Sequence, residues 1–230
     1  NESRCKLCRK FSSGRDNIEL YLAFFCFFSF CFVQRISFLY LCKMELKEKK
    51  KELRKLIRER KKQLSLSEKQ KEGKEIFSLI ENSSAYKQAN IVLLYWSMDD
   101  EVPTHDFILS NYENKTILLP CVVGDDLVLR KFSGMQSMKE GEQFGILEPT
   151  GEIFSDYEKI DLMIIPGVAF DRERKRIGRG RGFYDRLLAV NQNKKMGICF
   201  SCQLVESVPT EDFDVKMDFV VTPNEIIGNE

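Results

Sequence analysis

The stretch that decides the fold is Asp161-Leu162-Met163-Ile164-Ile165-Pro166-Gly167, followed after a short gap by Arg176-Ile177-Gly178-Arg179-Gly180-Arg181-Gly182-Phe183-Tyr184-Asp185. Its first part is an apolar run of strand length, as a strand buried on both faces of a sheet requires. Its second part is a basic, glycine-rich loop that leads into a predicted helix from about residue 183 to 190. A buried strand, such a loop and a helix are typical of α/β proteins, whose sites lie at the carboxyl ends of parallel strands.

Further strands and helices alternate on both sides of this stretch. Apolar runs of strand length begin at Ile91, Thr116, Lys195 and Asp218, and residues 126–132 alternate as in an edge strand or hairpin. Helices are predicted at about 67–81, where Ser67 is a plausible N-cap, and from Thr104 to about residue 110. The alternation predicts an α/β fold: a three-layer αβα sandwich with a mostly parallel central sheet.

A long amphipathic helix precedes this sandwich, at about residues 45–64. Its apolar residues recur at spacings of three, four and seven, which is the period of a helix that buries one face. A stripe of cations lies beside that apolar seam rather than opposite it. The stripe consists of Lys47, Lys50, Arg54, Arg58 and Lys61. If the seam docks on the body of the protein, these cations face whatever lies alongside.

Residues 1–43 differ in composition from the rest and contain five of the eight cysteines and eight of the eighteen phenylalanines. The apolar run at 20–33 is shorter than the roughly 20 residues that span a bilayer as a helix. No small-residue cleavage site follows it, and no methionine precedes Met44. We expect a non-native or mis-assigned leader, with a membrane anchor or a targeting peptide as alternatives, and a single domain over residues 44–230.

Composition narrows the class of protein further. The formal net charge is +1, so no bulk attraction to nucleic acid or to an anionic membrane is predicted. Cys121, Cys199 and Cys202 are too few and too scattered for a disulfide framework, which favours a reducing, cytoplasmic location. His105 is the only histidine, which argues against histidine-based metal hydrolysis and against a serine triad.

The glycine-rich loop has the chemistry of a phosphate site. Gly178, Gly180 and Gly182 let backbone N–H groups approach an anion, the interleaved arginines offer forked donors, and a helix N-terminus follows. Asp185 is placed to meet a Mg²⁺ ion carried by a nucleotide. A structural glycine turn and an Arg-Gly tract for nucleic acid remain alternatives, although the flanking strand and helix favour phosphate.

Several motifs together resemble the 5-formyltetrahydrofolate cyclo-ligase family. They are the basic segment 50–54, the acidic loop 97–101 with Thr104 after it, the segment 144–149, Pro166-Gly167, the Arg/Gly loop, and Asp214 with 218–222. They follow one another in the family's order over about Met44–Pro223. The resemblance implies a Mg²⁺- and ATP-dependent enzyme that converts 5-formyltetrahydrofolate to 5,10-methenyltetrahydrofolate and releases ADP and phosphate.

The implied chemistry explains the choice of residues. An N-formyl oxygen is a poor leaving group, and its phosphorylation lets a neighbouring amine displace it as phosphate. Catalysis is then mostly positioning and stabilisation of negative charge. The resemblance also implies a small-molecule enzyme, expected to be a cytoplasmic monomer, with no nucleic-acid partner and no membrane contact for residues 44–230. A nucleic-acid-binding protein, using the basic helix and the Arg/Gly loop, is the alternative.

By the same resemblance, Arg179 and Tyr184 are the candidate catalytic residues, with Arg179 on the transferred phosphoryl group. Trp96, Glu101 and Tyr184 match folate-side positions, and Asp185 and Asp214 match metal-associated carboxylates. The implied nucleotide contacts are Lys50, Arg54, Arg176, Gly178, Arg179, Gly180, Arg181, Gly182, Phe183 and Tyr184. Two positions depart from the family's usual residues: Phe183 stands where tyrosine is frequent, and Arg181 where lysine is common. Structural roles for Trp96, Glu101, Asp185 and Asp214 stay open.

Overall fold

The computed structural model describes residues 43–141, 145–211 and 213–228. It divides into one unit that ends at Glu48 and a second, Lys49–Glu230, which carries the fold discussed below. The predicted leader lies outside the described residues except for Lys43. Within the described ranges, no helix combines the length and the apolar character needed to cross a membrane.

The centre of the second unit is a seven-stranded sheet with the order β12-β11-β9-β6-β1-β2-β3. The five inner strands, β11, β9, β6, β1 and β2, are parallel to one another, and each of the two edge strands is antiparallel to the strand beside it. The prediction of a mostly parallel sheet is therefore confirmed. The strands are β1 (Ile91–Leu93), β2 (Thr116–Val123), β3 (Asp126–Lys131), β6 (Leu162–Pro166), β9 (Lys194–Ile198), β11 (Phe219–Val221) and β12 (Ile226–Ile227).

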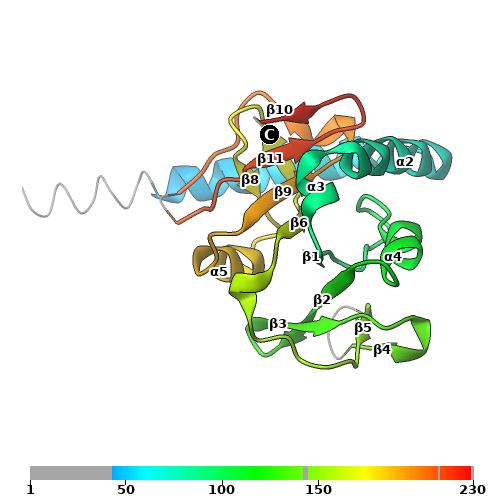
Figure 1. The fold of residues 1–230 in the computed structure, drawn as a ribbon. Helices are drawn as coiled ribbons and strands as arrows, with labels where there is room; N and C mark the ends of the chain where they lie inside the picture. Colours follow the sequence, from blue (N-terminus) through cyan, green and yellow to red (C-terminus); the bar gives the residue numbers. More distant parts are fainter. Residues whose placement is uncertain (1–42, 142–144, 212, 229–230) are drawn as a thin grey trace, which may run out of the picture. The chain divides into compact units, whose positions relative to one another are not determined.

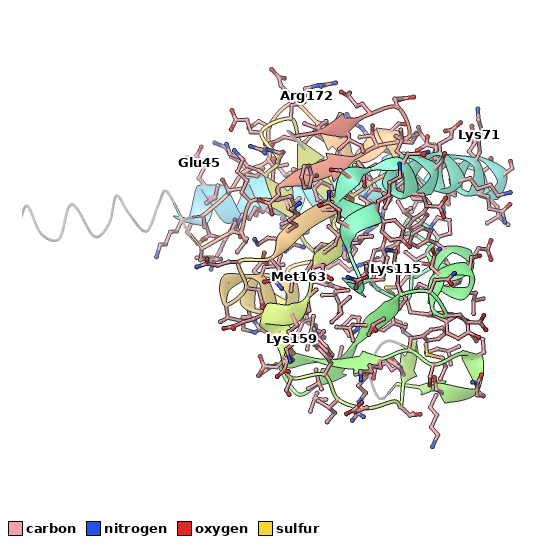
Figure 2. The ribbon with its side chains drawn as sticks, viewed as in Figure 1. Glu45, Lys71, Lys115, Lys159, Met163 and Arg172 are labelled. Atoms are coloured by element: carbon pink, nitrogen blue, oxygen red, sulfur yellow. The ribbon has the colours of Figure 1, made fainter. Side chains whose placement is uncertain are left out.

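Alternate residues of these strands pack on opposite faces of the sheet. Val92 of β1, and Leu94 directly after that strand, join the apolar cluster that contains residues of α2 (Leu66–Asn82), α3 (Ser84–Gln88) and α4 (His105–Asn111). Leu93 and Met163 join the other cluster, with Leu187 and Leu188 of α5 (Phe183–Ala189). Figure 1 shows the sheet between these helices, and in Figure 2 Met163 lies inside while Lys71 and Arg172 project outward. The sandwich thus has the predicted helical cover on both faces.

The first helix packs on a second, smaller sheet. The described residues of the first unit, 43–48, are helical, and so are residues 49–62 of the second unit, which confirms the predicted helix. Ile57 is fully buried against β7 (Ala169–Asp171) and β8 (Arg176–Ile177). These strands form a three-stranded sheet with β10 (Leu204–Val205). Strands this short leave no periodic pattern, so the sequence did not predict this sheet.

Two local details differ from the expectations. The N-cap of α2 is Ser65 rather than Ser67, because Ser65 and Glu68 form a reciprocal capping box. The segment 144–149, for which no strand was predicted, contains β5 (Leu147–Pro149), which pairs antiparallel with β4 (Met138–Glu140). Short 3₁₀ helices occupy Met135–Ser137, Tyr157–Lys159 and Ser201–Gln203.

Candidate active site

A cavity of about 380 Å³ opens at the carboxyl ends of β1, β2 and β6. Parallel strands place the loops that follow them at the same edge of the sheet, so residues far apart in the sequence meet here. The lining residues are Tyr95, Trp96, Met98, Glu101, Pro120, Val122, Leu127, Ile146, Leu147, Glu148, Pro166, Gly167, Arg176 and Gly178–Asp185.

The cavity has two chemically different walls. One is apolar and comes from the segment after β1, from β2 and β3, and from the segment around β5; its residues include Trp96, Met98, Val122 and Leu147. The other wall is the basic Arg/Gly loop, residues 176–182, which continues into the start of α5. A flat apolar ring system and a group of anionic oxygens can therefore be held side by side.

The first helix holds the Arg/Gly loop from behind. The Nε of Arg54 donates a hydrogen bond of 2.9 Å to the carbonyl oxygen of Gly178. Gly180 and Gly182 have φ values of 107° and 72°, in the left-handed region where a side chain is strained. A Cβ on Gly180 would also lie 3.6 Å from the Arg54 guanidinium. The left-handed turn is therefore what calls for glycine at these two positions, since a Cβ at 3.6 Å would make only an ordinary contact.

Arg179 joins this loop to the acidic segment after β1. Its Nε and Nη2 donate to Oε1 of Glu101 at 3.2 and 3.0 Å, and its Nη2 donates to Oδ1 of Asp100 at 2.5 Å. Asp100 is held in turn by Lys61 of the first helix, whose Nζ lies 2.6 Å from Oδ2. Arg179, expected at the phosphates, and Glu101, expected on the folate side, are therefore in direct contact.

The Arg176 side chain is buried inside the protein and is not an exposed cation. It is 2% exposed, and Nη2 forms an ion pair with Oδ1 of Asp185. Its Nη1 donates to the carbonyl oxygen of Pro166 at 3.2 Å, and its Nε has no hydrogen-bond partner among the described residues. The guanidinium also lies 5.8 Å from the centre of the Tyr184 ring. Arg176 thereby links the end of β6 to the first turn of α5.

Tyr184 faces the same interior. Burial, and secondarily the charge of Glu101, raises the pKa of its phenol well above the usual range. The phenol is therefore protonated at neutral pH and cannot act as a base there.

Trp96 lies just beyond β1 and forms part of the apolar wall. Its ring stacks on His105 of α4, with 4.1 Å between the ring centres. The His105 ring nitrogen Nε2 is 3.3 Å from the hydroxyl of Ser97, and the Thr104 hydroxyl donates to the carbonyl oxygen of Tyr95. These contacts fix the backbone on both sides of Trp96, so its indole is presented to the cavity in a defined position.

Lys50 and Asp214 meet each other outside the cavity lining. The Nζ of Lys50 lies 2.6 Å from Asp214 Oδ2 and 2.7 Å from Glu211 Oε2. Burial acts to lower the pKa of Lys50, but its hydrogen bonds to the two carboxylates outweigh burial and raise the pKa, so the amine is charged. Lys50, Arg54 and Lys61 all make contacts within the protein, which leaves less of the cationic stripe for nucleic acid.

The structure thus brings most predicted site residues to one cavity. Arg54 touches the Arg/Gly loop from behind, and Lys50 and Asp214 form a separate pair. The predicted residues in the lining are Trp96, Glu101, Arg176, Gly178, Arg179, Gly180, Arg181, Gly182, Phe183, Tyr184 and Asp185. Within the described ranges, no group of three or more His, Cys, Asp or Glu residues is arranged to hold a metal ion.

Comparison with known proteins identifies the family of this chain. The model of the 5-formyltetrahydrofolate cyclo-ligase family matches residues 46–223, which include both walls of the cavity and most of the first helix. The chain belongs to this family. Its activity is accordingly that of a cyclo-ligase, the conversion of 5-formyltetrahydrofolate to 5,10-methenyltetrahydrofolate. The predicted enzyme class and function are confirmed.

Individual relatives agree with the family match. The chain is 36% identical over 140 residues to the 5-formyltetrahydrofolate cyclo-ligase of Haemophilus influenzae, covering 57% of this chain and 74% of that protein. It is 30% identical over 181 residues to the enzyme of Escherichia coli, covering 74% and 98%. The solved structure of Aquifex aeolicus 5,10-methenyltetrahydrofolate synthetase superposes with a TM-score of 0.71 at 32% identity, covering 77% and 91%.

Two groups of residues in or beside the cavity were not singled out from the sequence. Asp100 and Lys61 were named only as parts of an acidic loop and a cationic stripe, because periodicity does not reveal which charges pair. The apolar wall residues Pro120, Val122 and Leu127 read as ordinary strand residues. The available signal was their position near the hairpin of β2 and β3, at the carboxyl end of β2, where α/β sites form.

Proposed function

We propose that this cyclo-ligase uses ATP and Mg²⁺, phosphorylates the formyl oxygen of its folate substrate in this cavity, and releases ADP and phosphate. The observation that carries the proposal is the contact between Arg179 and Glu101. It places the basic, glycine-rich wall next to the apolar, acid-bearing wall. A phosphoryl donor bound on one wall and a pterin bound on the other would meet at that contact.

The reaction needs an activated leaving group, because an amide oxygen does not leave unaided. The formyl oxygen takes the terminal phosphoryl group, and ADP departs. The amine at position 10 then attacks the formyl carbon, the carbon–oxygen bond breaks, and phosphate leaves with that oxygen. The amine loses its proton, and the bridge between positions 5 and 10 is complete.

The phosphate side is assigned to the Arg/Gly loop and the first helix. Arg179 has the exposure and the forked donors to follow a phosphoryl group as it transfers. The backbone N–H groups of Gly178, Gly180 and Gly182, with the side chain of Arg181, would hold the remaining phosphates. Helix α5 has only seven residues, so its dipole contributes little and the arginines carry more of the charge.

Further nucleotide contacts are assigned to neighbours of that loop. Arg54 holds the loop and faces Gly180. Lys50 lies one helical turn before Arg54 on the same face, where it would meet a more distant part of the nucleotide. Phe183 follows the loop and offers a ring to stack on. Arg176 acts from within, because its buried side chain fixes the loop to Asp185 and Pro166.

The folate side is assigned to the apolar wall. Trp96 offers a held ring face for the pterin, and Glu101 offers a carboxylate for its N–H groups. The Tyr184 hydroxyl, kept protonated by burial, would donate to the formyl group or to the phosphoryl oxygen. A cavity of about 380 Å³ holds one ligand of modest size, so only the reacting ends of the two substrates would share it.

Asp185 suits Mg²⁺ better than Asp214 does. Asp185 lines the cavity, and only its Oδ1 is taken, by Arg176; Oδ2 receives no hydrogen bond from the described residues. Asp214 Oδ2 already accepts from Lys50 and from the backbone N–H of Glu211. One carboxylate together with phosphate oxygens and water is a usual Mg²⁺ environment. A bound ion would neutralise charge on the transferring phosphoryl group.

The compartment and assembly state belong to the same proposal. Cys121, Cys199 and Cys202 are free thiols, which fits a reducing compartment such as the cytoplasm. For the assembly state, the proposal is a monomer.

The test follows the methenyl product spectroscopically with purified protein, 5-formyltetrahydrofolate and Mg²⁺, with and without ATP. The proposal expects product only with ATP, and loss of turnover in Arg179→Ala with unchanged thermal stability. Arg172→Ala, which removes an exposed arginine paired with Glu225 away from the cavity, is the matched control. Product formation without ATP, or full activity of Arg179→Ala, would contradict the proposal.

A further inference from the structure

The position of Arg179 depends on the acidic segment after β1. Its side chain is 48% exposed, and the loop around it contains glycines with left-handed backbone conformations. The three side-chain hydrogen bonds of Arg179 all run to Asp100 and Glu101. Without these two carboxylates, a long side chain on such a loop would sample many rotamers.

Asp100 is itself held from the other side. The Nζ of Lys61 donates to Asp100 Oδ2 at 2.6 Å and to its backbone oxygen at 2.7 Å, and the Lys61 side chain is only 7% exposed. Burial acts to raise the pKa of Asp100, but Lys61 and Arg179 together lower it, so the carboxylate is charged at neutral pH. Oδ1 remains for Arg179, and the direction of that oxygen is set by Lys61.

One helix face therefore fixes both loops of the site. Arg54 and Lys61 are seven residues apart, about two turns, and so lie on the same side of the first helix. Arg54 binds the Arg/Gly loop at Gly178, and Lys61 binds the acidic segment at Asp100. The helix acts as a spacer that sets the distance over which Arg179 reaches the acidic segment.

We propose that Asp100 is a positioning residue for Arg179: it holds the guanidinium beside Glu101 in the ligand-free protein and gives it up when the triphosphate binds. This inference rests on the proposed role of Arg179 at the phosphates. The same N–H groups cannot satisfy carboxylate and phosphate oxygens at once, so Asp100 competes with the nucleotide. When Arg179 turns to the phosphates, Glu101 loses its cationic partner and becomes available to the N–H groups of the pterin.

The size of the effect follows from the exposure of the pair. Asp100 and Arg179 are 43% and 48% exposed, so their pairing is screened by water. Exposed pairs contribute about 0.2–1 kcal/mol, so removing the competing carboxylate should tighten nucleotide binding by about 1.5- to fivefold.

The experiment measures the Kd of an ATP analogue with an imido group between its β- and γ-phosphates, with Mg²⁺ and without folate. Trp96 is the only tryptophan and lines the cavity, so its fluorescence reports binding. Asp100→Asn should lower the Kd by the factor above. Asp99→Asn makes the same charge change at an exposed neighbour whose carboxylate has no hydrogen bond within the described part of the chain, and should leave the Kd unchanged.

A double-mutant cycle separates positioning from a general charge effect. In an Arg179→Ala background, Asp100→Asn should no longer change the Kd, because Asp100 acts through Arg179. Three results would each overturn the inference. Asp100→Asn could leave the Kd unchanged, or lower the Kd equally with and without Arg179. Asp99→Asn could lower the Kd as much as Asp100→Asn does. If Arg179→Ala alone leaves the Kd and turnover unchanged, the proposed function of Arg179 fails instead.

Asp100→Asn leaves the buried Lys61 without its charge partner, and this variant could fail to fold. The pair Lys61→Met and Asp100→Asn removes both charges together, which is often tolerated. It should show the same tightening of analogue binding, again only when Arg179 is present, and a weaker or unchanged affinity would count against the inference.

Discussion

Replacing Arg176 with methionine tests how much its buried ion pair contributes to the free energy of unfolding. Methionine keeps most of the apolar stem but removes the ion pair with Asp185 and the hydrogen bond to the Pro166 oxygen. Breaking a fully buried pair costs about 3–5 kcal/mol, and Asp185 retains 23% exposure, so we expect a loss of about 2–3 kcal/mol in the free energy of unfolding. For a domain of this size, a loss of 1 kcal/mol lowers the thermal unfolding midpoint by about 2–4 °C, so that midpoint should fall by roughly 4–12 °C.

Urea denaturation of the purified protein measures the free energy of unfolding and thermal unfolding measures the midpoint temperature, with Arg172→Met as the matched control. Arg172 and Glu225 are 65% and 42% exposed, so the control should lose about 0.2–1 kcal/mol. If Arg176→Met lost no more than Arg172→Met, the buried pair would not support the site, and the reasoning from burial to stability would be refuted.

Three further predictions follow from the described contacts. Asp185→Asn should raise the Mg²⁺ concentration needed for half-maximal activity more than Asp214→Asn does, and equal Mg²⁺ titrations would contradict the assignment. Gly197→Ala should destabilise the protein by about 1–3 kcal/mol, because the new Cβ would lie 2.2 Å from a buried Phe170 ring carbon; an unchanged urea midpoint would speak against it. Burial lowers the pKa of His105 below the usual 6.5, so the unfolded chain binds this proton first as pH falls. Stability contributed by neutral His105 is thus present above pH 6.5 and is lost as pH falls from 6.5 toward the lower folded-state pKa. His105→Gln should flatten that part of a plot of unfolding free energy against pH, and an equal slope would refute the cause.

The layers and the position of the site could be predicted because they depend on local patterns. Apolar runs such as 161–165 can be satisfied only inside a sheet, and parallel order then brings Glu101 and Gly178 to the same edge. The left-handed glycines 180 and 182 were likewise readable as a turn beside an anion site.

Partner choice among charged residues could not be predicted. Lys50 pairs with Asp214, 164 residues away, and Lys61 with Asp100, yet each has many oppositely charged candidates in the sequence. Burial also changes what a residue can do: Arg176 reads as one more phosphate-binding arginine, but its side chain is almost fully enclosed. Such differences depend on tertiary packing, which periodicity does not report.

The fate of one oxygen atom tests the central claim most directly. Substrate carrying ¹⁸O in its formyl group is converted with unlabelled ATP in ordinary water, and the inorganic phosphate is analysed by mass spectrometry. If the formyl oxygen is phosphorylated and leaves, each phosphate released in product formation carries one ¹⁸O. Unlabelled phosphate, with the label recovered in water, would contradict the account.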